Sequence, residues 1–169
     1  MNRAIFLDRD GVINKARIEN GLAYSPRTLE EFELNPGVKE SIEHFKKLGF
    51  KVIVVTNQPE ISRGLLKQEE LDKMHAHLKS ELKVDDIMVC FHDDHHNCEC
   101  RKPKPGMLLE AAKKWNIDLT KSYMVGDRWK DVEAGKKAGC QTVLIDNPAK
   151  GKCEPGFHIN TFKEVLNIL

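Results

Sequence analysis

Short apolar stretches rich in β-branched residues alternate along the chain with longer segments in which apolar residues recur every three or four positions. The apolar stretches read as buried strands at 4–7, 51–55, 87–91, 123–125 and 142–145, with a weaker one at 157–159. Between them, the longer segments predict helices at 37–48, 67–82, 106–115, 130–138 and 161–169. Because strands alternate with helices, we expect an α/β fold built on a doubly wound, mostly parallel sheet.

The length of the chain and the positions of its proline and glycine residues refine this prediction. Pro36 and Pro105 precede two predicted helices, and Gly49 and Gly139 stand where helices should end. A chain of 169 residues can bury one substantial core but is short for two, so we expect a single domain over 1–169. The pattern leaves room for only a minimal cap, although the long connection at 11–35 is a candidate for substrate contact.

Polar residues follow three of the predicted strands at the point where each strand ends. Asp8 and Asp10 follow the first strand, residues 56–58 the second, and Asp127 and Asp131 the fourth. The carboxyl ends of parallel strands share one edge of a sheet, so these groups should converge there. An acidic turn after a strand can also be a solvated turn or a helix cap, but two carboxylate clusters at one edge favour a metal and phosphate site.

Cysteine and histidine residues crowd into the loop at 90–100. They form a C-x-H-x5-C-x-C arrangement of Cys90, His92, Cys98 and Cys100. Three thiolates and one imidazole suit a closed, structural zinc site, and metal binding can order a loop too polar to form a core. His95 and His96 remain alternatives for the histidine ligand, and a histidine-rich loop without metal is the competing interpretation.

The net charge and the absence of targeting segments limit the kinds of molecule that the protein is expected to bind. With 27 basic and 26 acidic residues, the chain has no general attraction for nucleic acid or for an anionic membrane. The amino terminus begins as a buried strand rather than a signal peptide, and no apolar run approaches membrane-spanning length. We therefore expect a cytoplasmic protein. The absence of a large cap leaves the cleft open, which favours a monomer acting on a small phosphorylated metabolite.

Four segments together resemble the motifs of the haloacid dehalogenase superfamily of phosphohydrolases, which have a Rossmann-like fold. Phe6-Leu-Asp-Arg-Asp-Gly-Val-Ile-Asn14 is similar to the first motif and Val55-Thr-Asn57 to the second. Lys102, within Arg101-Lys-Pro-Lys-Pro-Gly106, resembles the third, and Val125-Gly-Asp-Arg-Trp-Lys-Asp131 the fourth. The motifs occur in the family's order and span most of the chain, which makes chance agreement very improbable.

This resemblance implies a magnesium-dependent phosphatase and assigns roles to its residues. Asp8 would attack phosphorus to form an aspartyl-phosphate, and Asp10 would serve as acid and base. Thr56 and Lys102 would hold the phosphoryl oxygens. The family pattern would bind Mg²⁺ through Asp8, Asp127 and the backbone carbonyl of Asp10. Asp131 would then orient Lys102 or a metal-bound water.

A zinc loop directly before Arg101-Lys102, without a large cap, resembles one branch of the superfamily. This branch contains the D-glycero-D-manno-heptose 1,7-bisphosphate 7-phosphatases and the histidinol-phosphate phosphatases. The substrate-binding residues that the resemblance implies are Asn57, Gln58, Arg101 and Arg128. The shorter zinc loop looks more like the histidinol-phosphate group, and Pro59-Glu60 departs from the Ser-Gly pair usual in heptose enzymes.

Arg101 decides the ranking of the candidate functions. A planar guanidinium group suits a two-pronged contact with a second phosphate, and therefore favours a sugar bisphosphate. We expect removal of the 7-phosphate of heptose 1,7-bisphosphate, with histidinol-phosphate hydrolysis as the alternative. A noncatalytic, zinc-stabilised binding module is a third interpretation. It leaves unexplained why Asp8 and Asp10 should both be present.

Overall fold

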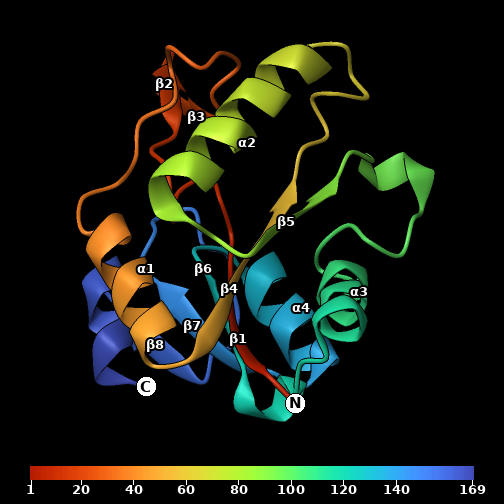
Figure 1. The fold of residues 1–169 in the computed structure, drawn as a ribbon. Coiled ribbons are helices and arrows are strands. Elements are labelled where there is room, and N and C mark those ends of the chain that lie inside the picture. Colours follow the sequence, from red (N-terminus) through yellow and green to blue (C-terminus); the bar gives the residue numbers. More distant parts are fainter.

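A six-stranded sheet in which all neighbouring strands are parallel organises the computed structural model, which describes residues 1–169 (Figure 1). Its strand order is β5-β4-β1-β6-β7-β8. The strands are β1 (Arg3–Leu7), β4 (Phe50–Asn57), β5 (Asp86–Cys90), β6 (Tyr123–Gly126), β7 (Gln141–Ile145) and β8 (Phe157–Ile159). The predicted α/β fold is confirmed, and so is its weaker last strand.

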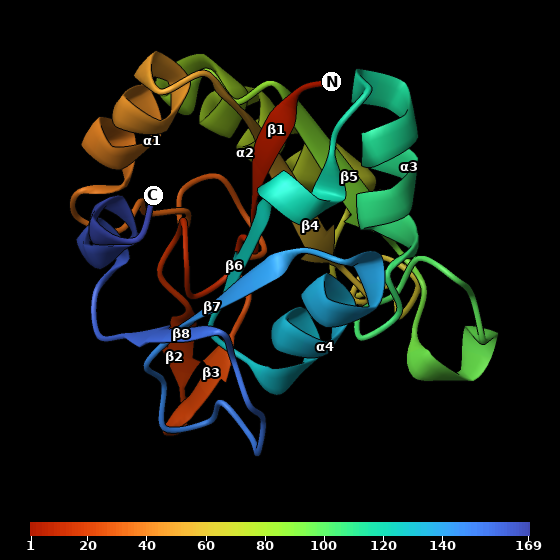
Figure 2. The same cartoon turned by 90° about the horizontal axis from the view of Figure 1, so that it is seen from below.

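Helices cover both faces of the sheet, because successive side chains of a strand point to opposite faces. α1 (Val38–Lys47) and α2 (Gln68–Leu82) pack on the face that holds Ile5 and Leu7. α3 (Gly106–Trp115) and α4 (Trp129–Ala138) pack on the face that holds Ala4 and Phe6. Figure 2 shows α1 and α3 on opposite sides of the sheet. Two short 3₁₀ helices, η1 (Asp94–His96) and η2 (Leu119–Lys121), lie in the connections.

The last segment differs from the prediction of an α-helix at 161–169. It forms a 3₁₀ helix, η3 (Phe162–Asn167). Its two buried side chains, Phe162 and Val165, are three residues apart, and a helix with three residues per turn stacks them on one face. The segment therefore covers the sheet beside α1 without an α-helical repeat.

The long connection at 11–35 contains a two-stranded hairpin that the sequence analysis did not predict. β2 (Arg17–Glu19) pairs antiparallel with β3 (Leu22–Tyr24). The turn between them is Asn20-Gly21, in which both residues have positive φ. Asn-Gly is a strong signal for such a two-residue turn, so the dipeptide could have revealed the hairpin.

The fold places the central strands where a site can form. β1 lies between β4 and β6, and all three end at the same edge of the sheet. None of the helices combines the length and the apolar composition that a membrane crossing requires.

Candidate active site

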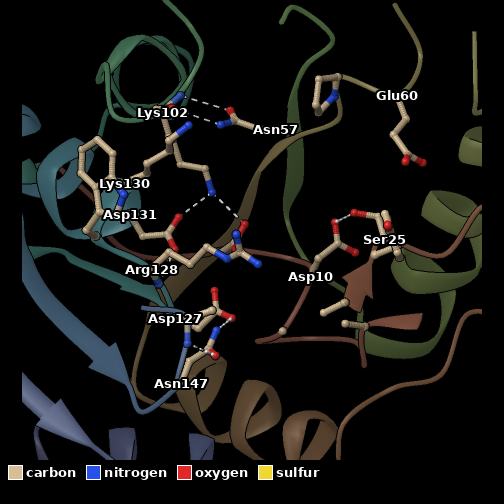
Figure 3. Close-up of a pocket in the computed structure, with 18 of the residues that line it drawn as sticks. Asp10, Ser25, Asn57, Glu60, Lys102, Asp127, Arg128, Lys130, Asp131 and Asn147 are labelled. Carbon is tan, nitrogen blue, oxygen red and sulfur yellow. Dashed lines mark hydrogen bonds and ion pairs between the residues drawn. The ribbon is translucent and has the colours of Figure 1, made fainter. Parts of the chain in front are cut away.

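A pocket opens at the edge of the sheet where β1, β4 and β6 end (Figure 3). Asp8 follows β1, Asn57 ends β4 and Asp127 follows β6, and all three line the pocket. Lys102 and Asp131 also line it. The structure therefore brings together the polar groups that were expected to converge, although they come from distant parts of the chain.

The Lys102 ammonium group is the centre of the hydrogen bonding in the pocket. Its Nζ donates to Asp8 Oδ1 and Asp131 Oδ1, both at 2.7 Å, and to the Val55 carbonyl oxygen at 2.8 Å. Burial alone would lower the pKa of Lys102, but the charges of Asp131 and Asp8 outweigh it and raise the pKa. Lys102 is therefore a permanently charged group beside Asp8, and its contact with Asp131 agrees with the orienting role expected for that residue.

Asn57 holds the backbone of residue 102 from the end of β4. Its Oδ1 accepts a hydrogen bond from the Lys102 amide at 3.1 Å, and its Nδ2 donates to the Lys102 carbonyl at 3.2 Å. The whole side-chain amide thus binds the loop that carries the lysine. The contact with substrate expected of Asn57 stays a prediction, since the structure assigns its polar atoms to positioning.

The carboxylates of Asp8, Asp127 and Asp131 form an acidic cluster. One oxygen from each residue lies within 4.8 Å of the others. Asn147 donates to Asp127 Oδ2 at 2.9 Å, whereas Asp127 Oδ1 is buried without a partner. Burial and the charge of Asp131 raise the pKa of Asp8 well above its usual value and that of Asp127 to about 6. A crowded carboxylate cluster with an unpaired buried oxygen suits a hard divalent cation such as Mg²⁺.

The chain turns immediately after Asp10, at Gly11, and this turn requires glycine. Gly11 has φ 88°, a left-handed conformation that strains other residues. A Cβ atom at this position would also collide with the carboxylate of Asp127. The absence of a side chain therefore allows the two acidic segments to approach each other.

Four side chains hold the carboxylate of Asp10. Oδ1 accepts from Arg9 Nη2 at 2.8 Å and from Asn14 Nδ2 at 3.0 Å, and Oδ2 accepts from Ser25 Oγ and Gln58 Nε2, both at 2.9 Å. Burial opposes ionisation, but the Arg9 charge and these hydrogen bonds outweigh it and lower the pKa of Asp10. In Figure 3, Asp10 lies beside Ser25, and Asp131 lies on the opposite side of the pocket.

Arg9 is a site residue that the sequence analysis missed. Its side chain is fully buried, and its Nη1 lies 3.0 Å from Nε2 of His75 on α2. Burial and the nearby Arg9 charge lower the pKa of His75 to about 4, so a neutral imidazole accepts this hydrogen bond. The only sequence signal was the place of Arg9 between two site aspartates, because its partner on α2 is distant along the chain.

Thr56 and Gln58 lie behind the pocket, and neither lines it. Gln58 Nε2 donates to Thr56 Oγ1 at 2.9 Å as well as to Asp10, and each of the two residues is 1% exposed. The phosphoryl contact expected of Thr56 and the substrate contact expected of Gln58 stay predictions. Gln58 links the Thr56 hydroxyl to the carboxylate of Asp10.

Arginine side chains occupy the outer wall of the pocket. Arg101, Arg128 and Arg63 all line it. Arg101 is held by the loop at 90–100, since its Nε donates to Asp94 Oδ1 at 2.7 Å and its Nη1 to the His92 carbonyl at 3.3 Å. The wall thus carries positive charge that could meet a second anionic group.

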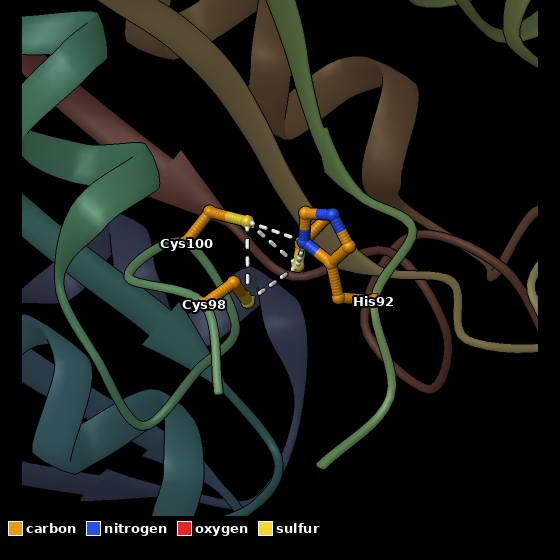
Figure 4. A group of neighbouring side chains, drawn as sticks. His92, Cys98 and Cys100 are labelled. Atoms are coloured by element: carbon orange, nitrogen blue, oxygen red, sulfur yellow. Dashed lines mark hydrogen bonds between the residues drawn. The ribbon is translucent and has the colours of Figure 1, made fainter. Parts of the chain in front are cut away.

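The cysteine and histidine side chains of the same loop form a compact group (Figure 4). The Cys98 sulfur lies 3.6 Å from that of Cys90 and 3.5 Å from that of Cys100. His92 Nδ1 lies 3.7 Å from the Cys90 sulfur and 3.4 Å from the Cys100 sulfur. Tetrahedral ligands about 2.3 Å from a zinc ion lie roughly 3.5 to 4 Å apart, and these four separations come close to that range. The Cys90 and Cys100 sulfurs, 2.8 Å apart, would have to move apart to hold the ion.

The structure separates His92 from the alternative histidines. His92 belongs to the group of potential metal ligands, whereas His95 and His96 do not. His96 Nδ1 accepts a hydrogen bond from the Asp93 amide at 2.8 Å, and the His95 ring lies against His96. The spacing that selected His92 therefore agrees with the geometry.

Comparisons with known proteins agree with the motifs. Residues 15–139 match the family of haloacid dehalogenase-like hydrolases. A Helicobacter pylori protein named D-glycero-beta-D-manno-heptose-1,7-bisphosphate 7-phosphatase is 36% identical, over 99% of this chain and 98% of its own. A Campylobacter jejuni relative named as the phosphatase of the alpha form is 35% identical, over 98% of this chain and 94% of its own.

A solved structure extends the likeness to the fold. The D,D-heptose 1,7-bisphosphate phosphatase from B. bronchiseptica, complexed with magnesium and phosphate, has a TM-score of 0.84 and 28% identity, over 99% of both chains. The family match covers most of the sequence, and the relatives align along nearly all of it. The chain therefore belongs to the haloacid dehalogenase-like hydrolase family.

Proposed function

We propose that this protein is a magnesium-dependent phosphatase that removes the 7-phosphate of D-glycero-D-manno-heptose 1,7-bisphosphate. The observation that carries the proposal is the Asp8 carboxylate, bound to Lys102 in a pocket that also holds Asp127 and an arginine-rich wall. Relatives that align over nearly the whole chain are named for this reaction. The expectations of one domain, a monomer and a cytoplasmic location stay predictions.

Asp8 is the nucleophile in this proposal. Its carboxylate oxygen forms a bond to phosphorus while the bond from phosphorus to the sugar oxygen breaks, which leaves an aspartyl-phosphate. Water then attacks phosphorus and releases inorganic phosphate and the free carboxylate. The Lys102 charge, 2.7 Å from Asp8, stabilises the negative charge on the transferring group and opposes the rise in the pKa of Asp8 that burial and Asp131 cause.

Asp10 moves the protons. Its lowered pKa suits the second step, in which it accepts a proton from the attacking water. The first step needs a protonated carboxyl group to neutralise the leaving sugar oxygen. The negative charge of a bound phosphate ester raises the pKa of a neighbouring carboxyl group, so substrate binding itself favours the acid form of Asp10.

The residues available for Mg²⁺ are Asp8 and Asp127, through their side chains, and Asp10, through its backbone carbonyl. The unpaired Asp127 Oδ1 is the observation that supports this set. When bound, Mg²⁺ supplies positive charge that lets an anionic phosphate enter an acidic cluster. The phosphatase of B. bronchiseptica was crystallised with magnesium and phosphate.

The second phosphate of the substrate would meet the arginine wall. Arg101 is partly covered and fixed by Asp94, and Arg128 is exposed directly after Asp127. Zinc at Cys90, His92, Cys98 and Cys100 would be structural, because four protein ligands leave no position for a catalytic water. It would fix the loop that holds Arg101.

The proposal is tested by measuring kcat/KM with both heptose 1,7-bisphosphate anomers and with histidinol phosphate, in Mg²⁺. We expect a preference for one heptose anomer of at least tenfold, with heptose 1-phosphate as the product identified by phosphorus NMR. Asp8→Asn should lower kcat by at least about a thousandfold, because the amide cannot form the covalent intermediate. A preference for histidinol phosphate, or an active Asp8→Asn variant, would contradict the proposal.

A further inference from the structure

An ion pair between Arg27 and Glu60 lies at the pocket wall and has no part in the hydrolysis described above. Glu60 lines the pocket, and Arg27 binds its carboxylate with both arms of the guanidinium group. Arg27 Nε donates to Glu60 Oε2 at 3.0 Å, and Arg27 Nη2 donates to Oε1 at 2.9 Å. The pair joins the connection at 11–35 to the turn that follows β4.

This pair fixes Glu60 in one orientation. The Glu60 carbonyl accepts hydrogen bonds from the amides of Leu65 at 2.9 Å and Leu66 at 3.2 Å, which anchors the turn. The Glu60 side chain is only 12% exposed, although it borders the pocket. Glu60 is thus held at its backbone carbonyl and at both side-chain oxygens. Its carboxylate is pre-organised for binding, because little rotational freedom remains to be lost.

The Glu60 carboxylate retains the capacity to bind a ligand. Each oxygen has two lone-pair directions, and Arg27 uses one on each. No other hydrogen-bond donor of the protein contacts these oxygens, and the remaining acceptor sites are therefore available to a molecule in the pocket. A phosphate group would be repelled by this carboxylate, whereas a hydroxyl group can donate to it.

Figure 3 shows Glu60 on the same side of the pocket as Asp10 and Ser25, with Lys102, Asp131 and Asp127 on the other side. Asp10 gives its proton to the leaving oxygen in the proposed reaction, so the carbon chain bonded to that oxygen must lie near Asp10. Glu60 consequently faces the leaving group rather than the phosphate that is transferred.

We propose that Glu60 is a specificity-determining residue that accepts hydrogen bonds from hydroxyl groups next to the hydrolysed phosphate ester. Arg27 is its positioning residue. The inference rests on the proposed function, since it takes the leaving group to be a polyhydroxylated chain. Arg27 already balances the Glu60 charge, which favours a neutral hydroxyl donor over an ammonium group as the ligand.

The test compares three substrates in Mg²⁺: heptose 1,7-bisphosphate, sorbitol 6-phosphate, and p-nitrophenyl phosphate, which has no hydroxyl beside its ester. We expect Glu60→Ala to lower kcat/KM about 10- to 100-fold for the two hydroxylated substrates, as for the loss of a hydrogen bond to a charged group. For p-nitrophenyl phosphate the change should stay within about threefold, because Glu60 has no partner there.

Glu31→Ala is the matched control. Glu31 also binds Arg27, through the Arg27 backbone amide at 2.9 Å, but it does not line the pocket. This variant should leave all three substrates within about threefold of the unmodified protein. Arg27→Lys should give an intermediate loss with the hydroxylated substrates, because one ammonium group cannot reproduce the two-armed contact.

Two outcomes would overturn the inference. In the first, Glu60→Ala lowers kcat/KM equally for all three substrates, which indicates a general structural role. In the second, it leaves the hydroxylated substrates unaffected. If the unmodified protein does not hydrolyse heptose 1,7-bisphosphate, the proposed function fails, yet the ratio of sorbitol 6-phosphate to p-nitrophenyl phosphate still decides the role of Glu60.

Discussion

The proton-transfer residue Asp10 is held by a charge buried behind it. Arg9 is fully buried and places its guanidinium group between Asp10 and His75. A buried arginine is tolerated only when its donors have partners, since an unpaired charge in a protein interior is costly. His75 must therefore remain neutral to accept the hydrogen bond from Nη1 of Arg9. A protonated imidazole would face Arg9 with a like charge.

The first prediction concerns the pH dependence of stability through His75. Its pKa is about 4 when folded and about 6.5 when unfolded, so both states are neutral above pH 6.5. As the pH falls below 6.5, only the unfolded chain takes up the proton, and the folded state loses stability. Between pH 7.5 and 5.5 this group should remove about 1 kcal/mol of unfolding free energy.

Urea unfolding of the unmodified protein and of His75→Gln at these two pH values measures this contribution. Glutamine can accept from Arg9 but does not titrate, so the variant should lack the loss of about 1 kcal/mol assigned to His75. Asp10, Asp72 and Arg9 also face His75 and are present in both proteins, which isolates the imidazole. An identical pH dependence in both proteins would show that His75 does not titrate abnormally.

Sequence reasoning at the residue scale succeeded where a strand end decides position. Asp8 and Asp127 converge because parallel strands end at one edge, and motif order also identified Lys102, which reaches them from the connection between β5 and α3. It did not predict the direction in which the Gln58 side chain donates, to Asp10 and to Thr56. That direction depends on partners from other segments, and one chain segment read alone does not contain them.

At the scale of elements, the loop at 90–100 connects the cysteine–histidine cluster to the pocket wall. Asp94 of η1 holds Arg101 at 2.7 Å, and Asp93, directly before η1, holds Arg63, which follows β4. Both arginines line the pocket. The order of the loop therefore determines where two positive groups stand.

The second prediction follows for Cys98→Ser. We expect the variant to lose its bound zinc and to raise KM for heptose 1,7-bisphosphate about tenfold, because Arg101 loses its fixed support. Hydrolysis of p-nitrophenyl phosphate, which has no second phosphate, should change much less. Metal analysis and steady-state kinetics provide the measurement, with Cys153→Ser as control, since Cys153 lies outside the cluster. Normal zinc content and normal KM in Cys98→Ser would contradict this role of the loop.

The elements that were predicted and those that were missed show which sequence signals were sufficient to identify an element. The four inner strands of the sheet, β4, β1, β6 and β7, were predictable from short apolar runs because burial on both faces leaves few polar residues in them. The β2–β3 hairpin was missed because Ile18 and Leu22 are exposed, so its strands show no buried face. The last segment is amphipathic, but its buried positions three residues apart match a 3₁₀ helix as well as an α-helix.

At the scale of the whole molecule, the fold concentrates negative charge that it cannot neutralise by itself. Asp8, Asp127 and Asp131 share the end of the central strands, and Lys102 supplies one positive charge among them. The raised pKa of Asp127, about 6, has the sign expected for this imbalance. Without a cation, this group contributes stability below its unfolded pKa of about 3.9, and that contribution is lost as the pH rises through 6.

The third prediction is therefore that Mg²⁺ stabilises the whole molecule, and more strongly at pH 7.5 than at pH 5.5. A ligand at 100 times its dissociation constant adds about 2.7 kcal/mol, which raises Tm by roughly 5 to 10 °C for a chain of this size. Protonation of Asp127 competes with the cation at the lower pH, so the increase in Tm should shrink there.

Asp127→Asn separates this effect from other consequences of added salt. The variant removes one of the three repelling charges, so it should be at least as stable as the unmodified protein without Mg²⁺ but should gain little stability when Mg²⁺ is added. Asp146→Asn is the matched control, because Asp146 lines the same pocket but pairs with Lys150 outside the acidic cluster. An equal rise in Tm in all three proteins, at constant zinc content, would mean that Mg²⁺ binds elsewhere and that the acidic cluster is not its site.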